Sequence, residues 1–209
     1  ASLNAGRPWT CAEAIERLRT IDTLIVDKTG TLTEGKPAFR EALAFGDFDE
    51  AEVLRLAASL DQGSEHPLAE SIVHEAHQRG LALEAADGFE SVTGIGVQGR
   101  VSGQSLLLGN TALMKERGVA TEVAHADAER LRSEGASAMF LAVDGRLAGL
   151  IAVSDPIKAS TAEAIAALRA AGLRIVMATG DGQTTAAAVA RTLGIDEVHG
   201  EVRPQDKSN

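Results

Sequence analysis

The chain has 209 residues, of which 44% are hydrophobic, so it can bury the core of one large domain or two ordinary ones and is not a disordered chain. Its 30 acidic and 20 basic residues give a net charge of -10, and aromatic residues make up only 3%, which together disfavour a nucleic-acid partner. The single cysteine, Cys11, excludes an internal disulfide, and no apolar run approaches the ~20 residues of a membrane helix, so the chain as given is expected to be soluble.

The first predicted elements are a helix and a buried strand. Residues 11–21 carry apolar side chains at helical intervals, and TLIVD at 23–27 has the pattern of a short buried strand. After a polar loop the pattern changes. Residues 38–45 alternate loosely like a strand, and residues 51–60 and 66–80 have the apolar spacing of amphipathic helices.

The middle of the chain predicts a second sheet. Residues 88–109 alternate and turn at glycines, which is typical of short antiparallel strands. Residues 121–134 predict another helix. Residues 137–153 contain two apolar runs that meet at an Asp-Gly pair, the pattern of a β-hairpin. Residues 34–153 are therefore expected to form an α+β unit with its own antiparallel sheet.

The last part of the chain alternates helices and strands. Residues 160–173 and 183–195 predict helices, whereas residues 174–180 and 197–200 predict strands. This alternation is typical of a parallel sheet with crossover helices, and the first helix and strand of the chain follow the same order.

The predicted fold is therefore α/β: an open, Rossmann-like parallel-sheet domain formed by residues 1–33 and 154–209, with an α+β domain of residues 34–153 inserted into it. Residues 1–10 are expected to be non-native or disordered.

Three polar side chains are expected at one edge of the parallel sheet. Asp27 and Thr179 each end a strand, and Lys207 follows a further one. A carboxylate, a hydroxyl and an ammonium group together suit the attack of the carboxylate on a phosphoryl group. Because the attacking carboxylate and the phosphate are both anionic, Mg²⁺ is expected between them.

The motifs around these residues carry a resemblance. DKTGTLT at 27–33 matches the phosphorylation motif of P-type ATPases, which are members of the haloacid dehalogenase-like superfamily. Thr-Gly-Asp at 179–181 resembles the second motif of that superfamily, and Pro204 with Lys207 resembles the third. Asp155 matches the Asp at the hinge that returns from the inserted domain. The resemblance implies these catalytic residues: Asp27, Lys28, Thr29, Thr179 and Lys207, with Mg²⁺ at Asp27 and Thr29.

The inserted segment resembles the heavy-metal-transporting type IB pumps, in which the matching residues bind ATP. Ser-Glu-His-Pro-Leu at 64–68 is similar to their His-Pro motif, where the His lies against the adenine. The family usually has Glu five residues before that His, and this chain has Asp61, one methylene shorter. The nucleotide-binding residues that the resemblance implies are Asp61, Glu65, His66, Gly94, Gly96, Gly109, Asn110, Asp155, Gly180 and Asp181.

Thr29 separates a pump from a phosphatase. Related soluble phosphatases carry Asp two residues after the nucleophile, where it activates the hydrolytic water, and Thr cannot do so at neutral pH. A slowly hydrolysed aspartyl phosphate suits a machine that moves while it is phosphorylated.

Other interpretations stay open at this point. The chain could be a soluble phosphatase with a large cap, or a nucleotide-sensing module whose Asp27 never reacts. The paired glycines could be turn glycines without a ligand, and His66 could be a helix-start residue with a solvated ring. Asp181 could cap the helix that begins near Thr184.

The resemblance implies a cytoplasmic fragment of an integral membrane pump. The chain ends just after the third motif, and it lacks the membrane helices and the actuator domain of the family, which are its expected partners beside ATP. We expect the strand at 23–27 to be an exposed apolar edge, and the sheet domain to be incomplete, stabilised by self-association, or followed by residues outside the given sequence. Copper is the first candidate for the transported ion and zinc the second.

Overall fold

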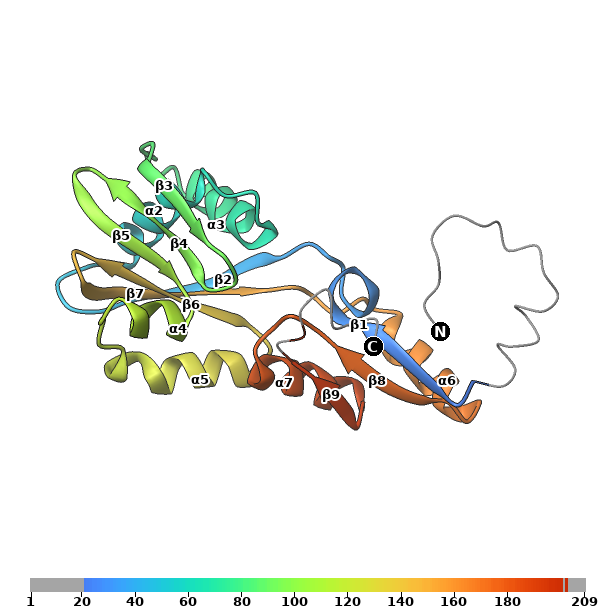
Figure 1. Cartoon of the computed structure of the whole chain (residues 1–209). Coiled ribbons are helices and arrows are strands. Elements are labelled where there is room, and N and C mark those ends of the chain that lie inside the picture. The colour runs from blue at the N-terminus through green and yellow to red at the C-terminus, as the bar shows by residue number, and fades with distance from the viewer. Residues whose placement is uncertain (1–20, 201, 203–209) are drawn as a thin grey trace. The chain divides into compact units, whose positions relative to one another are not determined.

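The computed structural model describes residues 21–200 and residue 202, and these form two compact units (Figure 1). Unit 1 joins the chain up to Thr33 to the chain from Ile157 onward, and unit 2 consists of Glu34–Pro156. The helix predicted at 11–21 and the predicted site residue Lys207 lie outside the described residues. None of the described helices has both the length and the apolar character needed to cross a bilayer.

Unit 1 contains a parallel sheet with the strand order β1-β8-β9. Its strands are β1 (Thr23–Asp27), β8 (Arg174–Ala178) and β9 (Glu197–His199), and its helices are α6 (Thr161–Ala170) and α7 (Gln183–Leu193). Met177 of β8 is fully buried, and it packs with Ile165 of α6 and with Val189 and Leu193 of α7. The helix-strand alternation of residues 160–200 is therefore confirmed as a parallel sheet with crossover helices.

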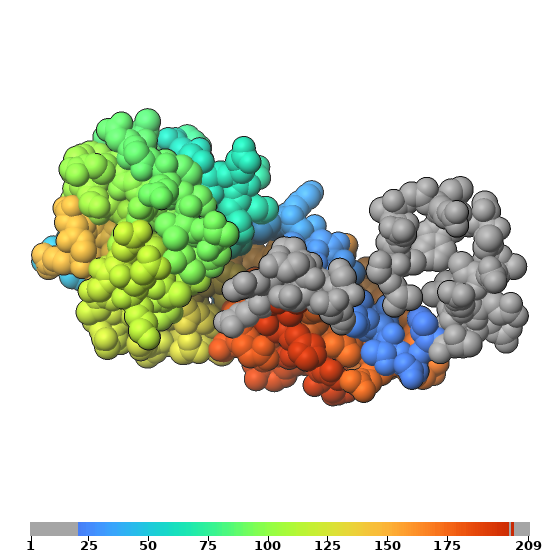
Figure 2. All heavy atoms as spheres, in the orientation of Figure 1, coloured from blue at the N-terminus to red at the C-terminus, as the bar shows by residue number. Residues whose placement is uncertain are grey.

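Strand β1 lies at the edge of this sheet as far as the described residues show. Its Ile25 side chain is 62% exposed, and atoms of the first described residues lie at the surface in the space-filling view (Figure 2). Among the described strands, β1 therefore has the edge position predicted for it, with one large apolar side chain exposed. Self-association through it stays a prediction, since an unpaired strand edge is only a template for pairing.

Unit 2 contains a six-stranded antiparallel sheet with the order β2-β7-β6-β5-β4-β3. The strands are β2 (Ala38–Ala44), β3 (Asp87–Val92), β4 (Gly96–Val101), β5 (Gln104–Gly109), β6 (Ser137–Val143) and β7 (Arg146–Ser154). The turn between β6 and β7 has positive φ at Asp144 (47°) and Gly145 (78°), as the Asp-Gly pair predicts.

Helices pack on both faces of the unit 2 sheet (Figure 1). Helices α2 (Glu50–Asp61) and α3 (Pro67–Gln78) bury Leu54, Leu56 and Ile72 against one face. The other face packs against α4 (Thr111–Glu116), the short 3₁₀ helix η2 (Glu122–Ala124) and α5 (His125–Ser133). Helix α4 was not predicted from the sequence pattern.

The chain crosses between the units through two neighbouring segments. Within unit 1, Thr33 forms an antiparallel bridge with Ile157. Within unit 2, the Glu34 N–H donates to the Pro156 carbonyl at 2.8 Å. The return crossing lies three residues beyond the boundary expected at 153, because β7 continues to Ser154 and Pro156 still pairs with the outgoing segment.

Candidate functional site

Two of the predicted catalytic residues lie side by side at the carboxyl ends of neighbouring strands. Strands β1 and β8 are parallel with Asp27 opposite Ala178, so Thr179 follows directly beside Asp27. The Thr179 side chain is 1% exposed, and its backbone N–H donates to the His199 carbonyl at 2.9 Å. Asp27 is exposed. The predicted juxtaposition of these two strand ends is therefore present, and the carboxylate is accessible to a ligand.

An ion pair joins the first motif to the second. Lys28 is only 6% exposed, and its Nζ lies 2.7 Å from Oδ2 of Asp181. The same carboxylate oxygen accepts a hydrogen bond from Thr179 Oγ1 at 3.2 Å. A buried ammonium group needs a carboxylate partner, because an unpaired buried charge costs several kcal/mol, roughly 3–5 by analogy with broken buried pairs.

This ion pair also corrects the interpretation of Asp181 as a helix cap. Helix α7 begins at Gln183, its N-cap residue is Gly182, and no side chain makes a capping hydrogen bond there. The Asp181 carboxylate faces Lys28 instead. The long-range ion pair therefore outweighs the local capping preference of Asp.

The loop that follows Asp27 is wrapped around a buried threonine. Thr33 is fully buried, and its Oγ1 donates to the Lys28 carbonyl at 3.0 Å and accepts from the Gly30 N–H at 3.3 Å. Gly30 has φ +74°, a left-handed conformation that glycine adopts without a steric penalty. Gly30 and Thr33, the last Thr of DKTGTLT, therefore have a structural role in shaping the loop. Thr29, two residues after Asp27, stays exposed.

The exposed oxygens of this loop fit a magnesium ion that is only partly held by protein. The described residues contain no group of three or more His, Cys, Asp or Glu side chains that could hold a metal ion by themselves. Asp27 offers a carboxylate, and Thr29, two residues further along the chain, is also exposed and carries oxygen donors. Mg²⁺ prefers hard oxygen ligands and usually takes one or two carboxylates together with waters and substrate phosphates, so this donor set suits it.

In unit 2, two of the predicted glycines are required by the packing of the backbone itself. Gly96 pairs with Gly109 across β4 and β5. A Cβ atom on Gly109 would lie 2.2 Å from the Ile95 carbonyl oxygen, and one on Gly96 would lie 2.3 Å from the Leu108 carbonyl oxygen. The backbone packing at these two positions therefore leaves no room for a side chain. Gly94 differs, because it has φ +77° and open space around its Cβ position.

Asn110 connects this glycine cluster to helix α4. Its Oδ1 accepts hydrogen bonds from the N–H groups of Ala112 (3.0 Å) and Leu113 (3.2 Å), so it is the N-cap of the helix. Its Nδ2 donates to the Gly94 carbonyl at 3.3 Å. One side chain thus fixes the turn between β3 and β4 against the beginning of α4 and brings four predicted residues into one cluster.

Three more of the predicted nucleotide-binding residues, Asp61, Glu65 and His66, lie in or beside the loop between α2 and α3. Asp61, at the end of α2, is 5% exposed, and burial raises its pKa from 3.8 to about 7. Glu65 and His66 are exposed. Nδ1 of His66 accepts a hydrogen bond from the Leu68 N–H at 3.2 Å, so His66 is the N-cap of α3, with its ring exposed. The interpretation of His66 as the residue at the start of a helix is confirmed. The cap uses only Nδ1, so the exposed remainder of the ring is available to a ligand.

A contact that the sequence pattern did not predict holds this loop on the sheet. A Cβ atom on Gly63 would lie 2.8 Å from Cγ of Phe89, so the loop packs on the Phe89 ring of β3. No hydrogen bond among the described residues joins the loop to the glycine cluster.

Two further predicted residues lie apart from this loop. Gly180 lies in unit 1 beside Asp181. In unit 2, Oδ1 of Asp155 accepts from the Lys36 N–H at 3.2 Å.

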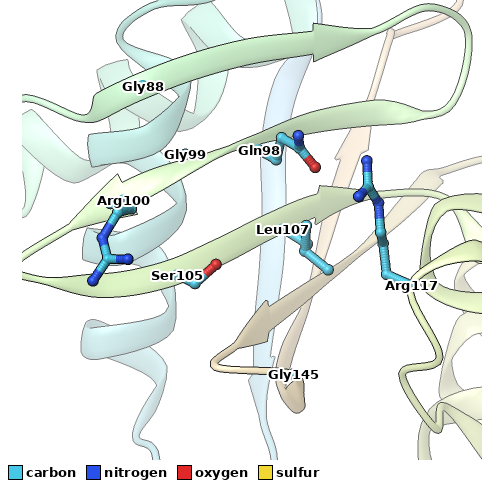
Figure 3. Close-up of a pocket in the computed structure, with 8 residues that line it drawn as sticks. All are labelled: Gly88, Gln98, Gly99, Arg100, Ser105, Leu107, Arg117 and Gly145. Carbon is cyan, nitrogen blue, oxygen red and sulfur yellow. The ribbon is translucent and has the colours of Figure 1, made fainter.

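A pocket of about 420 Å³ lies elsewhere on the unit 2 sheet (Figure 3). Arg100 and Arg117 lie at different ends of it, with Gln98 and Leu107 between them in the view. The polar groups already have partners: Arg100 donates to the Gly103 carbonyl, and Gln98 donates to Glu90. None of the lining residues is a predicted site residue.

Comparison with known proteins identifies relatives of most of the chain. A family model described as haloacid dehalogenase-like hydrolase matches residues 21–209. The chain is 53% identical to a copper-transporting P-type ATPase of Rhizobium leguminosarum bv. viciae and 49% identical to a silver exporting P-type ATPase of Salmonella typhimurium. Each alignment covers 94% of this chain but only 23% and 24% of the relatives. The chain thus spans about a quarter of the length of these relatives.

Solved structures with the same fold include a zinc-transporting PIB-type ATPase in an E2.Pi state. The identity is 34% and the TM-score 0.67, over 93% of this chain and 31% of that one. The catalytic domain of the CPx-ATPase CopB-B, solved in a study of conformational changes upon nucleotide binding, is 25% identical with a TM-score of 0.66, over 95% of this chain and 68% of that one. These matches confirm the predicted fold class, an α/β chain with an inserted α+β segment.

Proposed function

Because the chain belongs to the haloacid dehalogenase-like hydrolase family, we propose that it is the ATP-binding and phosphorylated part of a heavy-metal-transporting P-type ATPase. In this proposal Asp27 accepts the γ-phosphate of ATP. The observation that carries it is the accessible carboxylate of Asp27 at the end of β1, directly beside the buried Thr179 and the Lys28–Asp181 ion pair. The copper and silver P-type ATPases to which the chain is similar support the same function.

The proposed reaction is a phosphoryl transfer to a carboxylate. An oxygen of Asp27 bonds to the γ-phosphorus of ATP, the bond from that phosphorus to the β,γ-bridging oxygen breaks, and ADP leaves with the electron pair. Thr179 and Lys207 hold phosphate oxygens. Mg²⁺, when bound at Asp27 and Thr29, supplies the positive charge that allows two anionic groups to approach. The product is an aspartyl phosphate, and Thr29 offers no general base to hasten its hydrolysis.

Unit 2 is proposed to hold the nucleotide. The α2–α3 loop provides the exposed ring of His66, and the Asn110-bound turn provides the open side of Gly94. Glycine without a Cβ lets a ligand approach the backbone closely. The other domains of the same pump, an actuator and a membrane domain, are the proposed partners. Copper is the proposed transported ion, in line with the similar copper-transporting ATPases.

Acid-quenched labelling tests the phosphorylation of Asp27. The chain is incubated with γ-labelled ATP and Mg²⁺, quenched in acid and treated with hydroxylamine, which cleaves acyl phosphates. We expect a hydroxylamine-sensitive label in the parent chain and in the matched control Asp22→Asn, and no label in Asp27→Asn. A label that survives hydroxylamine, or one that persists in Asp27→Asn, would contradict the proposal. Steady hydrolysis of small phosphate esters would instead favour a phosphatase.

Two substitutions of His66 separate a role in binding from its role as a helix cap. His66→Asn keeps a capping oxygen, whereas His66→Ala removes both the cap and the ring. We expect both variants to bind ATP roughly tenfold more weakly, because the aromatic contact is lost. Only His66→Ala should lower the stability of unit 2, by about 1 kcal/mol. Calorimetric titration with ATP and urea unfolding measure the two effects, and parent-like ATP affinity in His66→Asn would assign the ring no part in binding.

A further inference from the structure

The loop after Asp27 receives donors from the segment that returns from unit 2. The ammonium group of Lys158 donates to the Gly30 carbonyl at 2.6 Å. The Lys158 backbone N–H donates to the Leu32 carbonyl at 3.1 Å, and Oγ1 of Thr161 donates to the same carbonyl at 2.7 Å. With the Thr33 contact to the Lys28 carbonyl, these bonds determine which way the loop peptides face.

Lys158 differs from an ordinary surface lysine in what its ammonium group contacts. Its side chain is half-buried, and within the described part of the chain it makes no ion pair. The partner is instead the neutral carbonyl of Gly30, in the middle of the phosphorylation motif. Ordering a lysine side chain costs about 2 kcal/mol of rotamer entropy, so a fixed 2.6 Å contact is not the default state of an exposed lysine.

Lys158 contacts Gly30, and glycine has the widest range of allowed backbone conformations of any residue. Gly30 has a left-handed φ of +74° and no side chain of its own, so its two peptide groups are held from outside: Thr33 Oγ1 accepts from its N–H, and Lys158 donates to its carbonyl. The other lysine of the region, Lys28, already uses its charge on Asp181. Lys158 is therefore the cation that holds the carbonyl of the Gly30–Thr31 peptide, which lies one residue after Thr29 and three after Asp27, the residues proposed to meet Mg²⁺ and phosphate.

We propose that Lys158 is a positioning residue for the phosphorylation of Asp27. By holding the Gly30 carbonyl it keeps the Asp27–Thr29 segment in the geometry needed for in-line attack. This inference rests on the proposed function. Small errors in the placement of reacting groups have large effects on rate, with about 1 Å costing on the order of 100-fold. Lys158 also lies directly after the crossing at Pro156–Ile157, so it ties the loop to the point where the two units are joined.

Single-turnover labelling of the 209-residue chain with γ-labelled ATP and Mg²⁺ tests this role. Lys158→Ala is expected to slow label formation roughly tenfold or more, with the ATP dissociation constant unchanged in calorimetry. Lys158→Arg keeps a cationic donor and is expected to restore most of the rate. Lys115→Ala, at an exposed lysine of α4, is the matched control and should behave like the parent.

A second readout keeps the inference separate from the proposed function. Without nucleotide, the carbonyl ¹³C shift of Gly30 should change in Lys158→Ala and return toward the parent value in Lys158→Arg. Parent-like labelling in Lys158→Ala, a matching loss of ATP affinity, or failure of the Arg variant to restore the rate would overturn the positioning role. If the parent chain takes no label, the proposed function fails, and the carbonyl shift alone decides: an unchanged shift overturns the contact, and a changed one supports it.

Discussion

Gly109→Ala is expected to unfold unit 2 under conditions in which the parent chain is folded. The new Cβ atom would lie 2.2 Å from the Ile95 carbonyl oxygen and 2.9 Å from the Gly96 Cα. Both are backbone atoms of hydrogen-bonded β4 and its preceding turn, so neither can move without breaking the ladder. Overpacking of this kind usually costs about 1–3 kcal/mol, and we expect at least the upper end because these two clashes are with backbone rather than with the end of a flexible side chain.

The control for this prediction is Gly118→Ala. Gly118 has φ +69° but nothing within 4 Å of its Cβ position, so only backbone strain is introduced, on the order of 1–2 kcal/mol. Urea unfolding followed by the methyl resonances of Leu54 and Leu56 reports on unit 2 alone. Equal losses of stability in the two variants would show that the backbone around Gly109 moves aside for the methyl group at little cost, and would contradict the prediction. A loss of ATP binding in Gly109→Ala would not by itself identify a ligand contact, because this glycine is already needed for folding.

Asp61→Asn is expected to stabilise unit 2 at neutral pH and to leave it unchanged in acid. Burial raises the pKa of Asp61 from 3.8 to about 7, so the folded state holds a proton that the unfolded state releases between these values. The free energy of unfolding of the parent therefore falls as pH rises from about 4 to about 7, and then levels off. The shift corresponds to a gain on the order of 4 kcal/mol for the Asn variant above pH 7.

The measurement is the difference in unfolding free energy between variant and parent at several pH values. It should be close to zero near pH 4, grow through pH 5 and 6, and reach its plateau at about pH 7 to 8. Asp47→Asn, at a carboxylate whose side chain is 94% exposed, is the control and should give a small difference at every pH. A constant difference between Asp61→Asn and the parent across this range would contradict the raised pKa.

Most of the fold could be predicted because its signals are local. The Asp-Gly pair at 144–145 specifies a hairpin turn by its backbone conformation alone, and Pro67 marks the first turn of α3. The pairing of β1 with β8 followed from the alternation of helices and strands, which permits few arrangements of a parallel sheet. Helix α4 was missed although Asn110 is a good N-cap, because its six residues give too short an apolar pattern.

The site was less predictable where its contacts join distant parts of the chain. The local preference of Asp for helix N-caps left a capping role for Asp181 open beside a role in binding nucleotide, and nothing local indicates that the carboxylate pairs with the buried Lys28. Lys158 and Gly30 are 128 residues apart, and nothing in the sequence around either indicates the other. The raised pKa of Asp61 depends on how deeply the end of α2 is buried, and that depth is set by packing on the sheet rather than by the residues beside it.

The bridge between Thr33 and Ile157 determines how freely residues 34–156 can change in length. Opposed residues in an antiparallel bridge have Cα atoms about 4.5–5.5 Å apart, so the segment leaves and rejoins unit 1 as the two arms of a hairpin do. Loop-closure entropy grows only with the logarithm of loop length, about 0.6 kcal/mol for each doubling. Lengthening or trimming residues 34–156 therefore costs unit 1 little, and selection can reshape unit 2 without disturbing the strand that ends in Asp27.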